Sequence, residues 1–126
     1  MAYTKDLSDA AGRHFKDGRK LQEAKHYDGA GYHYGFAAEC ALKDRLLAAG
    51  VRADDDSIWK HFPELPSFAL RALSTRSAAP LRTIFERKDF FQYWSTDMRY
   101  AVTGSVDEAR AEKWRNQANQ ALGLLL

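Results

Sequence analysis

The sequence predicts an all-α fold, an antiparallel up-and-down bundle of four long helices and one short helix, within one domain spanning residues 1–126. Apolar residues recur at helical spacing through most of the chain. The connections between these apolar segments are short, as they are in up-and-down bundles. No alternating strand pattern, internal repeat or low-complexity linker interrupts them. A chain of 126 residues is also long enough to form a core without metal or disulfide staples.

Two helices are expected in the first half of the chain. Helical spacing predicts the first over residues 4–24 and the second over residues 27–47, with Gly50 as a C-terminal stop residue. The inner side of the second helix is lined by small residues, namely Ala30, Gly31, Gly35, Ala37, Ala38 and Ala41. Small side chains would let another helix backbone approach closely.

The middle of the chain is predicted to hold two loops, a short helix and a long one. Residues 51–57 carry three consecutive aspartates and are expected to form a solvated acidic loop. Pro63 and Pro66 bracket a second loop, and a short third helix follows over residues 68–73. After a break at residues 77–79, Pro80 is expected to open a long fourth helix.

The fourth helix is expected to carry more aromatic side chains than one face needs. Its apolar positions are Leu81, Ile84, Phe85, Phe90, Phe91 and Trp94, with Tyr93 beside them. One side of this helix could therefore meet another subunit. Gly104 then breaks the chain, and Ser105 and Glu108 have the spacing of a capping box for the last helix.

Composition and charge describe an ordinary globular protein. Hydrophobic residues make up 45% of the chain and charged residues 29%, and the net charge of +2 neither requires nor excludes nucleic acid. Cys40 is the one cysteine, so an intramolecular disulfide is impossible. No apolar run approaches the length of a membrane span or a signal peptide. The expected setting is the cytoplasm, with no cofactor, no metal site and no membrane partner.

Glu39 and Lys43 are the first candidate functional residues. They lie four positions apart on one face of the second helix, among its small packing residues. Two interpretations stay open. The two side chains could form an ordinary surface ion pair, or Glu39 could face inward and hold Arg99 or His61, because a buried carboxylate needs a partner.

Several short motifs, taken in order, give the chain a resemblance to a known family. Tyr27 and Asp28 open the second helix, which contains the run Ala-Ala-Glu-Cys-Ala-Leu-Lys ending at Lys43. His61 begins a His-Phe-Pro-Glu-Leu segment, and Arg99 is followed by Tyr100. Together with a Ser-x-x-Glu-Ala cap on the last helix, this order resembles the HEPN domain, a small helical bundle. The resemblance covers roughly residues 6–122.

Some HEPN proteins are ribonucleases, and the resemblance therefore raises this activity for the chain. The sequence argues against it, because one residue of the motif is absent at its expected place. Many of them are metal-independent ribonucleases with an Arg-x(4–6)-His motif, in which the histidine transfers a proton and the arginine steadies the phosphate. Arg99 lies where that arginine is expected, but no histidine follows His61. Arg19 and His26 have the right spacing, at the wrong place in the fold.

We therefore expect a non-catalytic HEPN-like binding module for nucleotide, RNA or a partner protein such as a nucleotidyltransferase. The alternative is a toxin-like, metal-independent ribonuclease with an atypical site. The candidate binding residues are Glu39, Lys43, His61, Arg99 and Tyr100. The family resemblance and the apolar C-terminal residues 124–126 also lead us to expect a homodimer.

Overall fold

The fold is all-α, as the sequence predicts. The structure is a computed structural model, which describes residues 3–52, 56–73 and 78–126. Within these residues it contains helices and no strand. The elements are α1 (Leu7–Glu23), α2 (Tyr27–Ala48), η1 (Asp56–Trp59), α3 (Leu65–Ala72), α4 (Ala79–Glu86), η2 (Thr96–Tyr100) and α5 (Glu108–Gly123), where η marks a 3₁₀ helix.

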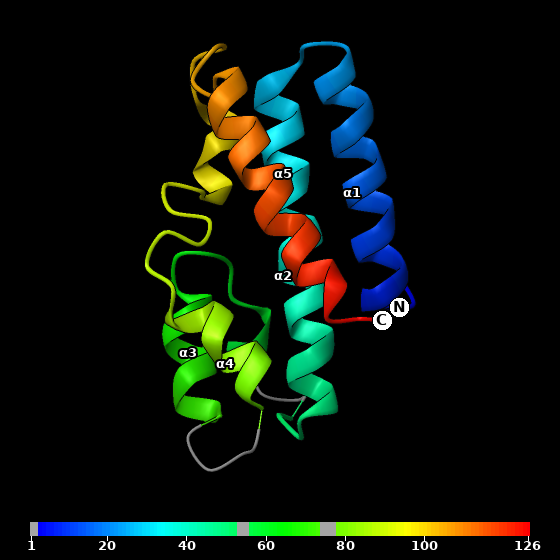
Figure 1. Cartoon of the computed structure of the whole chain (residues 1–126), viewed down its shortest axis with the longest axis vertical. Coiled ribbons are helices and arrows are strands. Elements are labelled where there is room, and N and C mark those ends of the chain that lie inside the picture. Colours follow the sequence, from blue (N-terminus) through cyan, green and yellow to red (C-terminus); the bar gives the residue numbers. More distant parts are fainter. Residues whose placement is uncertain (1–2, 53–55, 74–77) are drawn as a thin grey trace.

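Helices α1, α2 and α5 pack together along their length (Figure 1). α1 and α2 form an antiparallel hairpin, because only a short turn joins them. α5 runs in the same direction as α2, while α3 and α4 form a pair beside the C-terminal half of α2 (Figure 1). The helices therefore do not alternate strictly up and down. The connection over residues 87–107 returns the chain to the start of α2 without a long helix.

The prediction of a long fourth helix is wrong. α4 ends at Glu86, and the chain then turns through two aromatic residues with left-handed backbone conformations, Phe91 at φ 53° and Tyr93 at φ 72°. A helix cannot continue through such residues. Phe90, Phe91 and Trp94 are nevertheless buried, so their apolar character reflects core packing at turn positions. The described chain has three long helices and two short ones.

The small residues of α2 allow close packing, but at Gly31 and Gly35 the groups that approach are aromatic rings and not the backbone of another helix. A Cβ added at Gly35 would fall inside the Trp94 indole, and one added at Gly31 would lie 2.8 Å from a Trp114 ring atom. The Trp94 Nε1–H also donates to the Gly31 carbonyl over 3.0 Å. The two glycines therefore leave the space in which two tryptophans pack against the helix.

Several predicted boundaries shift by a few residues. α3 begins at Leu65 and places Pro66 in its first turn, where a missing N–H costs no hydrogen bond. The cap of α5 is Asp107, whose carboxylate accepts from the Arg110 N–H over 2.8 Å, and the predicted Ser105 cap is wrong. The Ser105 hydroxyl donates to a carbonyl in its own turn instead. The break predicted at residues 77–79 and the acidic loop lie partly outside the described residues, since 53–55 and 74–77 are not described.

Two groups of hydrogen bonds fix how the long helices and their loops align. Tyr34 of α2 donates to Gln22 of α1 over 2.5 Å, and Gln22 donates to Glu112 of α5 over 2.6 Å. Burial raises the pKa of Tyr34 to about 12, so the phenol keeps its proton. At the start of α2, the Asp28 carboxylate accepts from the backbone N–H groups of Gly104 and Val106 over 2.7 and 2.8 Å. These bonds tie the loop before α5 to α2.

Candidate functional site

Glu39 faces inward and holds the loop that precedes α3. Its side chain is 2% exposed. One carboxylate oxygen lies 2.7 Å from His61 Nδ1, and the other accepts from the Phe62 N–H over 2.8 Å. The predicted contact between Glu39 and His61 is therefore present. The carboxylate also fixes the backbone of Phe62, a contact that the sequence did not indicate.

Lys43 is the buried cation of this cluster. Its Nζ lies 3.7 Å from Glu39, and the residue is 5% exposed, so the pair is not an ordinary surface ion pair. Burial lowers the pKa of Lys43, and the carboxylate of Glu39 opposes that change. Lys43 and Lys5 both lie over the Trp59 ring, at 5.9 and 4.1 Å from its centroid.

His61 is the solvent-facing member of the cluster. Its side chain is 46% exposed. A proton on Nδ1 would be donated to this carboxylate and would leave Nε2 for a second interaction. The imidazole also lies edge-on to the ring of Phe36, with the centroids 6.0 Å apart. An imidazole oriented by a carboxylate can donate to a phosphate or exchange a proton.

Arg99 and Tyr100 do not join Glu39, and that part of the predicted cluster is wrong. Both residues lie in η2 and are exposed, Tyr100 by 79%. The Arg99 guanidinium lies over the Tyr100 ring, 5.1 Å from its centroid. A turn over residues 87–95 replaces the predicted continuous helix, and η2 beyond it leaves Arg99 and Tyr100 exposed.

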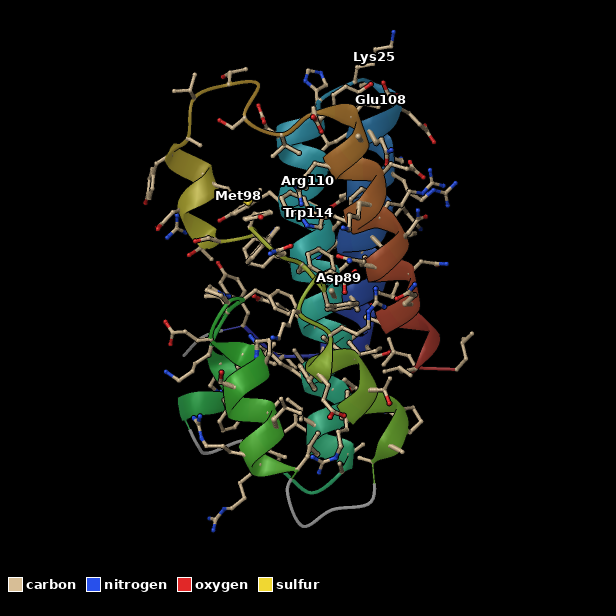
Figure 2. All side chains as sticks on the ribbon, turned by 60° about the vertical axis from the view of Figure 1, so that its left-hand side comes forward. Lys25, Asp89, Met98, Glu108, Arg110 and Trp114 are labelled. Atoms are coloured by element: carbon tan, nitrogen blue, oxygen red, sulfur yellow. The ribbon has the colours of Figure 1, made fainter. Side chains whose placement is uncertain are left out.

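A second arginine covers a second exposed tyrosine. The Arg110 guanidinium lies 4.8 Å from the centroid of Tyr93, which is 71% exposed, and 5.7 Å from that of Trp114. Arg110 and Trp114 extend from α5 on the side of the molecule where Met98 of η2 lies (Figure 2). We call Tyr93, Arg99, Tyr100 and Arg110 the Arg–Tyr surface.

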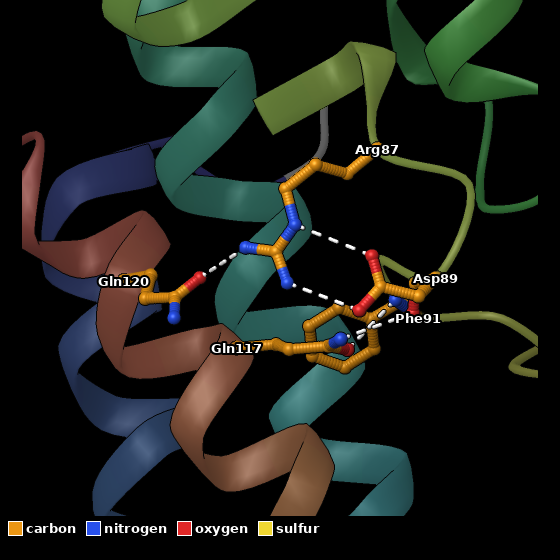
Figure 3. Close-up of polar contacts among 5 residues, drawn as sticks. All are labelled: Arg87, Asp89, Phe91, Gln117 and Gln120. Atoms are coloured by element: carbon orange, nitrogen blue, oxygen red, sulfur yellow. Dashed lines mark hydrogen bonds and ion pairs between the residues drawn. The ribbon is translucent and has the colours of Figure 1, made fainter. Parts of the chain in front are cut away.

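The turn after α4 is fixed by a polar network on α5 (Figure 3). The buried Gln117 amide accepts from the Phe91 N–H over 2.8 Å and donates to the Asp89 carbonyl over 3.0 Å. Arg87 bonds the carboxylate of Asp89 with two nitrogens, at 3.1 and 3.2 Å, and donates to Gln120 over 2.6 Å. The bonds from Arg87 lower the pKa of Asp89. This network holds the left-handed residues of the turn in place.

A groove of about 430 Å³ lies between the start of α3 and this turn. Phe62, Pro66, Leu70, Phe90 and Tyr93 contribute to its walls. Polar groups at the groove come from Ser67, Glu86, Arg87, Lys88 and Gln92, so the groove carries charges of both signs. Glu39 links its own cluster to the groove, because it accepts a hydrogen bond from the Phe62 N–H and Phe62 lines the groove.

The remaining histidines and Cys40 form no recognised catalytic arrangement in the described chain. His14 Nδ1 lies 3.1 Å from His33 Nδ1, which links α1 to α2, and His26 is exposed at the N-terminus of α2. Burial raises the pKa of the Cys40 thiol, which favours its neutral form. No group of three or more His, Cys, Asp or Glu side chains in the described residues could hold a metal ion.

Sequence reasoning missed the network around Gln117 and the groove. An isolated glutamine on the last helix gave no motif, and its partners are backbone groups about 26 residues earlier. The aromatic surplus near residue 90 is the available signal, but its spacing also fits a helix face. The left-handed backbone at Phe91 and Tyr93 leaves no mark in the sequence, since neither residue is glycine or asparagine.

Comparison of the chain with protein-family models, with curated proteins and with solved structures found no match. The family resemblance therefore rests on the motifs described above. Among the described helices, none combines the length and the apolar character needed to cross a bilayer.

Proposed function

We propose that this chain is a non-catalytic, HEPN-like module that binds RNA or nucleotide. The observation that carries the proposal is the Arg–Tyr surface. Two exposed tyrosine rings, Tyr93 and Tyr100, each lie against an arginine, Arg110 and Arg99. Aromatic faces stack on bases of any sequence, while guanidinium groups bind phosphates without transferring a proton.

The buried Glu39 cluster supports this function by holding the loop before α3 in position. His61 is partly exposed and can donate from Nε2 when it is protonated, while Lys43 contributes a buried positive charge close to it. The cluster holds Phe62 in place and so shapes the surface next to η2 and the turn after α4. In this proposal Glu39 positions the loop, and the exposed residues contact the ligand.

The alternative function is a metal-independent ribonuclease. One observation favours it: the Glu39–His61 pair has the carboxylate–imidazole arrangement of a general base. The expected histidine after Arg99 is absent, and Tyr100, with a reference pKa of about 10, is a poor proton carrier at neutral pH. We therefore expect binding without cleavage.

Binding can be measured by the fluorescence anisotropy of a labelled ten-nucleotide oligouridylate. Base stacking is worth about 1–3 kcal/mol per base, so Tyr100→Ala should weaken binding roughly 5- to 150-fold. Arg99→Ala should weaken binding and reduce its salt dependence. Tyr3→Ala is the matched control, because Tyr3 is 94% exposed on the N-terminal segment. Equal affinities of Tyr100→Ala and Tyr3→Ala would contradict the proposed surface.

Cleavage is tested with the same RNA in the presence of EDTA. The wild-type chain should leave the RNA intact. Metal-independent cleavage lost in Arg99→Ala or His61→Ala would establish the alternative function. Loss in His26→Ala would instead identify the Arg19–His26 pair, which the sequence places at the end of the first helix.

Further proposals concern the partners of the chain and its setting. We propose a homodimer, and a nucleotidyltransferase as a candidate protein partner, in the cytoplasm. Co-purification with a nucleotidyltransferase encoded beside this chain would support the second partner.

A further inference from the structure

We propose that His14 and His33 form a binding site for a divalent transition-metal ion, Cu²⁺ before Zn²⁺, between α1 and α2, with water as its other ligands. His14 lies on α1 and His33 on α2, and their Nδ1 atoms lie 3.1 Å apart. Histidine is the commonest metal ligand in proteins. Neither residue belongs to the Arg–Tyr surface or to the Glu39 cluster, so the inference goes beyond the proposed function.

The separation of the two nitrogens suits a shared metal ion. A bond between Zn²⁺ and an imidazole nitrogen is about 2.0–2.1 Å long, so two such bonds from atoms 3.1 Å apart would meet at roughly 98°. This angle lies between the right angle of a tetragonal site and the roughly 109° of a tetrahedral site. An ion can therefore bind both nitrogens while the helices stay in place, provided that the rings turn so that both lone pairs point to it.

The two rings are held in position by the packing of the helices. α1 and α2 pack along their length (Figure 1), and side chains on helices are positioned more precisely than those on loops. The imidazole centroids lie 5.3 Å apart with their planes inclined by 35°. The Phe36 ring lies against His14, with the centroids 5.5 Å apart. Metal binding would therefore order little of the chain that is not already ordered.

Both imidazoles can offer a lone pair without releasing a proton. When both rings are neutral, one Nδ1 carries the proton of the hydrogen bond between them and the other accepts it. A metal ion binds only an unprotonated nitrogen. The proton on Nδ1 would therefore move to Nε2 of the same ring, which changes the tautomer of that ring and leaves both imidazoles neutral.

The ligand set determines the kind of ion. Within the described residues, no third His, Cys, Asp or Glu side chain completes a metal site with this pair, so water would fill the other positions. Both histidines are partly exposed, which gives water access. Arg13 and Asp17 act on His14 with opposite charges, so the neighbouring charges do not by themselves exclude a cation. Imidazole suits Cu²⁺, Zn²⁺ and Ni²⁺, and Cu²⁺ binds a given set of ligands most tightly in this series.

The test titrates Cu²⁺ into the full chain, purified without a histidine tag, and records electron paramagnetic resonance spectra. With up to one equivalent of Cu²⁺, the wild-type spectrum should show coupling to two imidazole nitrogens. His14→Gln and His33→Gln should each lose one coupling. Changes to groups that only orient a ligand cost about 10- to 100-fold in metal affinity, so the loss of a ligand should cost at least as much. His26→Gln is the matched control, because His26 is exposed at the N-cap of α2, and it should bind as wild type does.

Thermal stability gives a second measurement. An ion that binds only the folded chain stabilises it, so excess Zn²⁺ should raise the melting temperatures of wild type and His26→Gln. It should leave those of His14→Gln and His33→Gln unchanged. Mg²⁺ prefers oxygen ligands and should change none of the four melting temperatures.

Three results would each overturn the site: a wild-type copper spectrum with fewer than two nitrogen couplings, Cu²⁺ binding that both substitutions leave unchanged, or an equal response to Mg²⁺. If a variant does not fold, the imidazole signals of the wild-type NMR spectrum decide, because Zn²⁺ should shift those of His14 and His33 and leave those of His26 and His61 in place. The oligouridylate assay is independent of these measurements, so RNA binding without a metal site would leave the proposed function standing.

Discussion

A single buried carboxylate, Glu39, organises the interior around the loop before α3. It accepts from His61 and from the Phe62 backbone, and it lies beside the buried ammonium group of Lys43. Burying a charge is costly unless partners replace its water, and here three groups do so. The cluster illustrates how a polar residue within a stripe of small side chains can determine the position of a segment 22 residues later.

Replacing Glu39 by alanine should destabilise the protein strongly. The change leaves the Lys43 ammonium without its counter-ion and the Phe62 N–H without an acceptor, and breaking a buried pair in this way costs about 3–5 kcal/mol. Urea denaturation measures the free energy of unfolding. Glu64→Ala removes an exposed carboxylate that pairs with Lys60 and should cost at most about 1 kcal/mol. Similar losses for both variants would contradict the buried pair.

His14 should make stability depend on pH near neutrality. Burial, followed by the neighbouring His33 and Arg13, lowers the pKa of His14, and Asp17 opposes them. The unfolded chain then binds a proton that the folded chain excludes, so stability is present above the unfolded-state pKa of about 6.5 and is lost as the pH falls below it.

Urea denaturation between pH 5 and pH 8 checks the role of His14. The wild-type chain should lose more stability on acidification than His14→Gln does. His26→Gln is the control, because His26 is exposed. The prediction is wrong if His14→Gln and wild type show the same dependence.

At the scale of elements, α2 is the helix against which α1 and α5 pack. Its glycines face tryptophans from two different parts of the chain, Trp94 at Gly35 and Trp114 at Gly31. The sequence predicted close packing from the small residues. It could not predict which groups approach, because a small side chain provides space without specifying its occupant.

Gly35→Ala should be severely destabilising and Gly12→Ala should be stabilising. The added methyl group at Gly35 would overlap the Trp94 indole, and overpacking costs at least about 1–3 kcal/mol. At Gly12, on α1, nothing lies within 4 Å of an added Cβ, so alanine should gain roughly 0.5–1 kcal/mol from its higher helix propensity. Thermal melts of the two variants compare the same chemical change at a packed and an open position.

The turn after α4 should loosen when Gln117 is replaced by leucine. Leucine keeps much of the volume but removes the acceptor for the Phe91 N–H and the donor to the Asp89 carbonyl. Each buried group left unpaired costs about 1–3 kcal/mol. Hydrogen exchange at residues 88–93 should accelerate. Gln120→Ala changes an exposed partner of Arg87 and should leave that exchange nearly unchanged.

At the scale of the whole molecule, the remaining exposed apolar groups lie mainly between α4 and α5. Tyr93, Tyr100 and Val102 are each more than two-thirds exposed, and Leu126 is fully exposed. Phe85, Phe90, Phe91 and Trp94, which first suggested a subunit contact, are buried within the chain itself. We therefore place the proposed dimer contact at Val102, outside the Arg–Tyr surface, and no longer on the predicted fourth helix.

Light scattering at micromolar concentration should give twice the chain mass of 14.3 kDa. An apolar surface exposed to water is unfavourable unless a partner covers it. Val102→Glu should then shift the mass toward that of a monomer, whereas Ala109→Glu, at an exposed position of α5, should not. A monomer mass for the wild-type chain would contradict the homodimer.

The sequence by itself determined the helical fold and the extents of α1, α2 and most of α5, and it offered His61 as one of two candidate partners for an inward-facing Glu39. These follow from local periodicity and from the need of a buried carboxylate for a partner. Only the tertiary structure decided the path of residues 87–107, the outward position of Arg99 and the groove beside Lys88. Apolar spacing predicts that Phe90, Phe91 and Trp94 are buried, but it does not distinguish a helix from a turn. Here a turn held by Gln117 buries them. The bonds that select the turn join groups far apart in the chain, so no local pattern contains them.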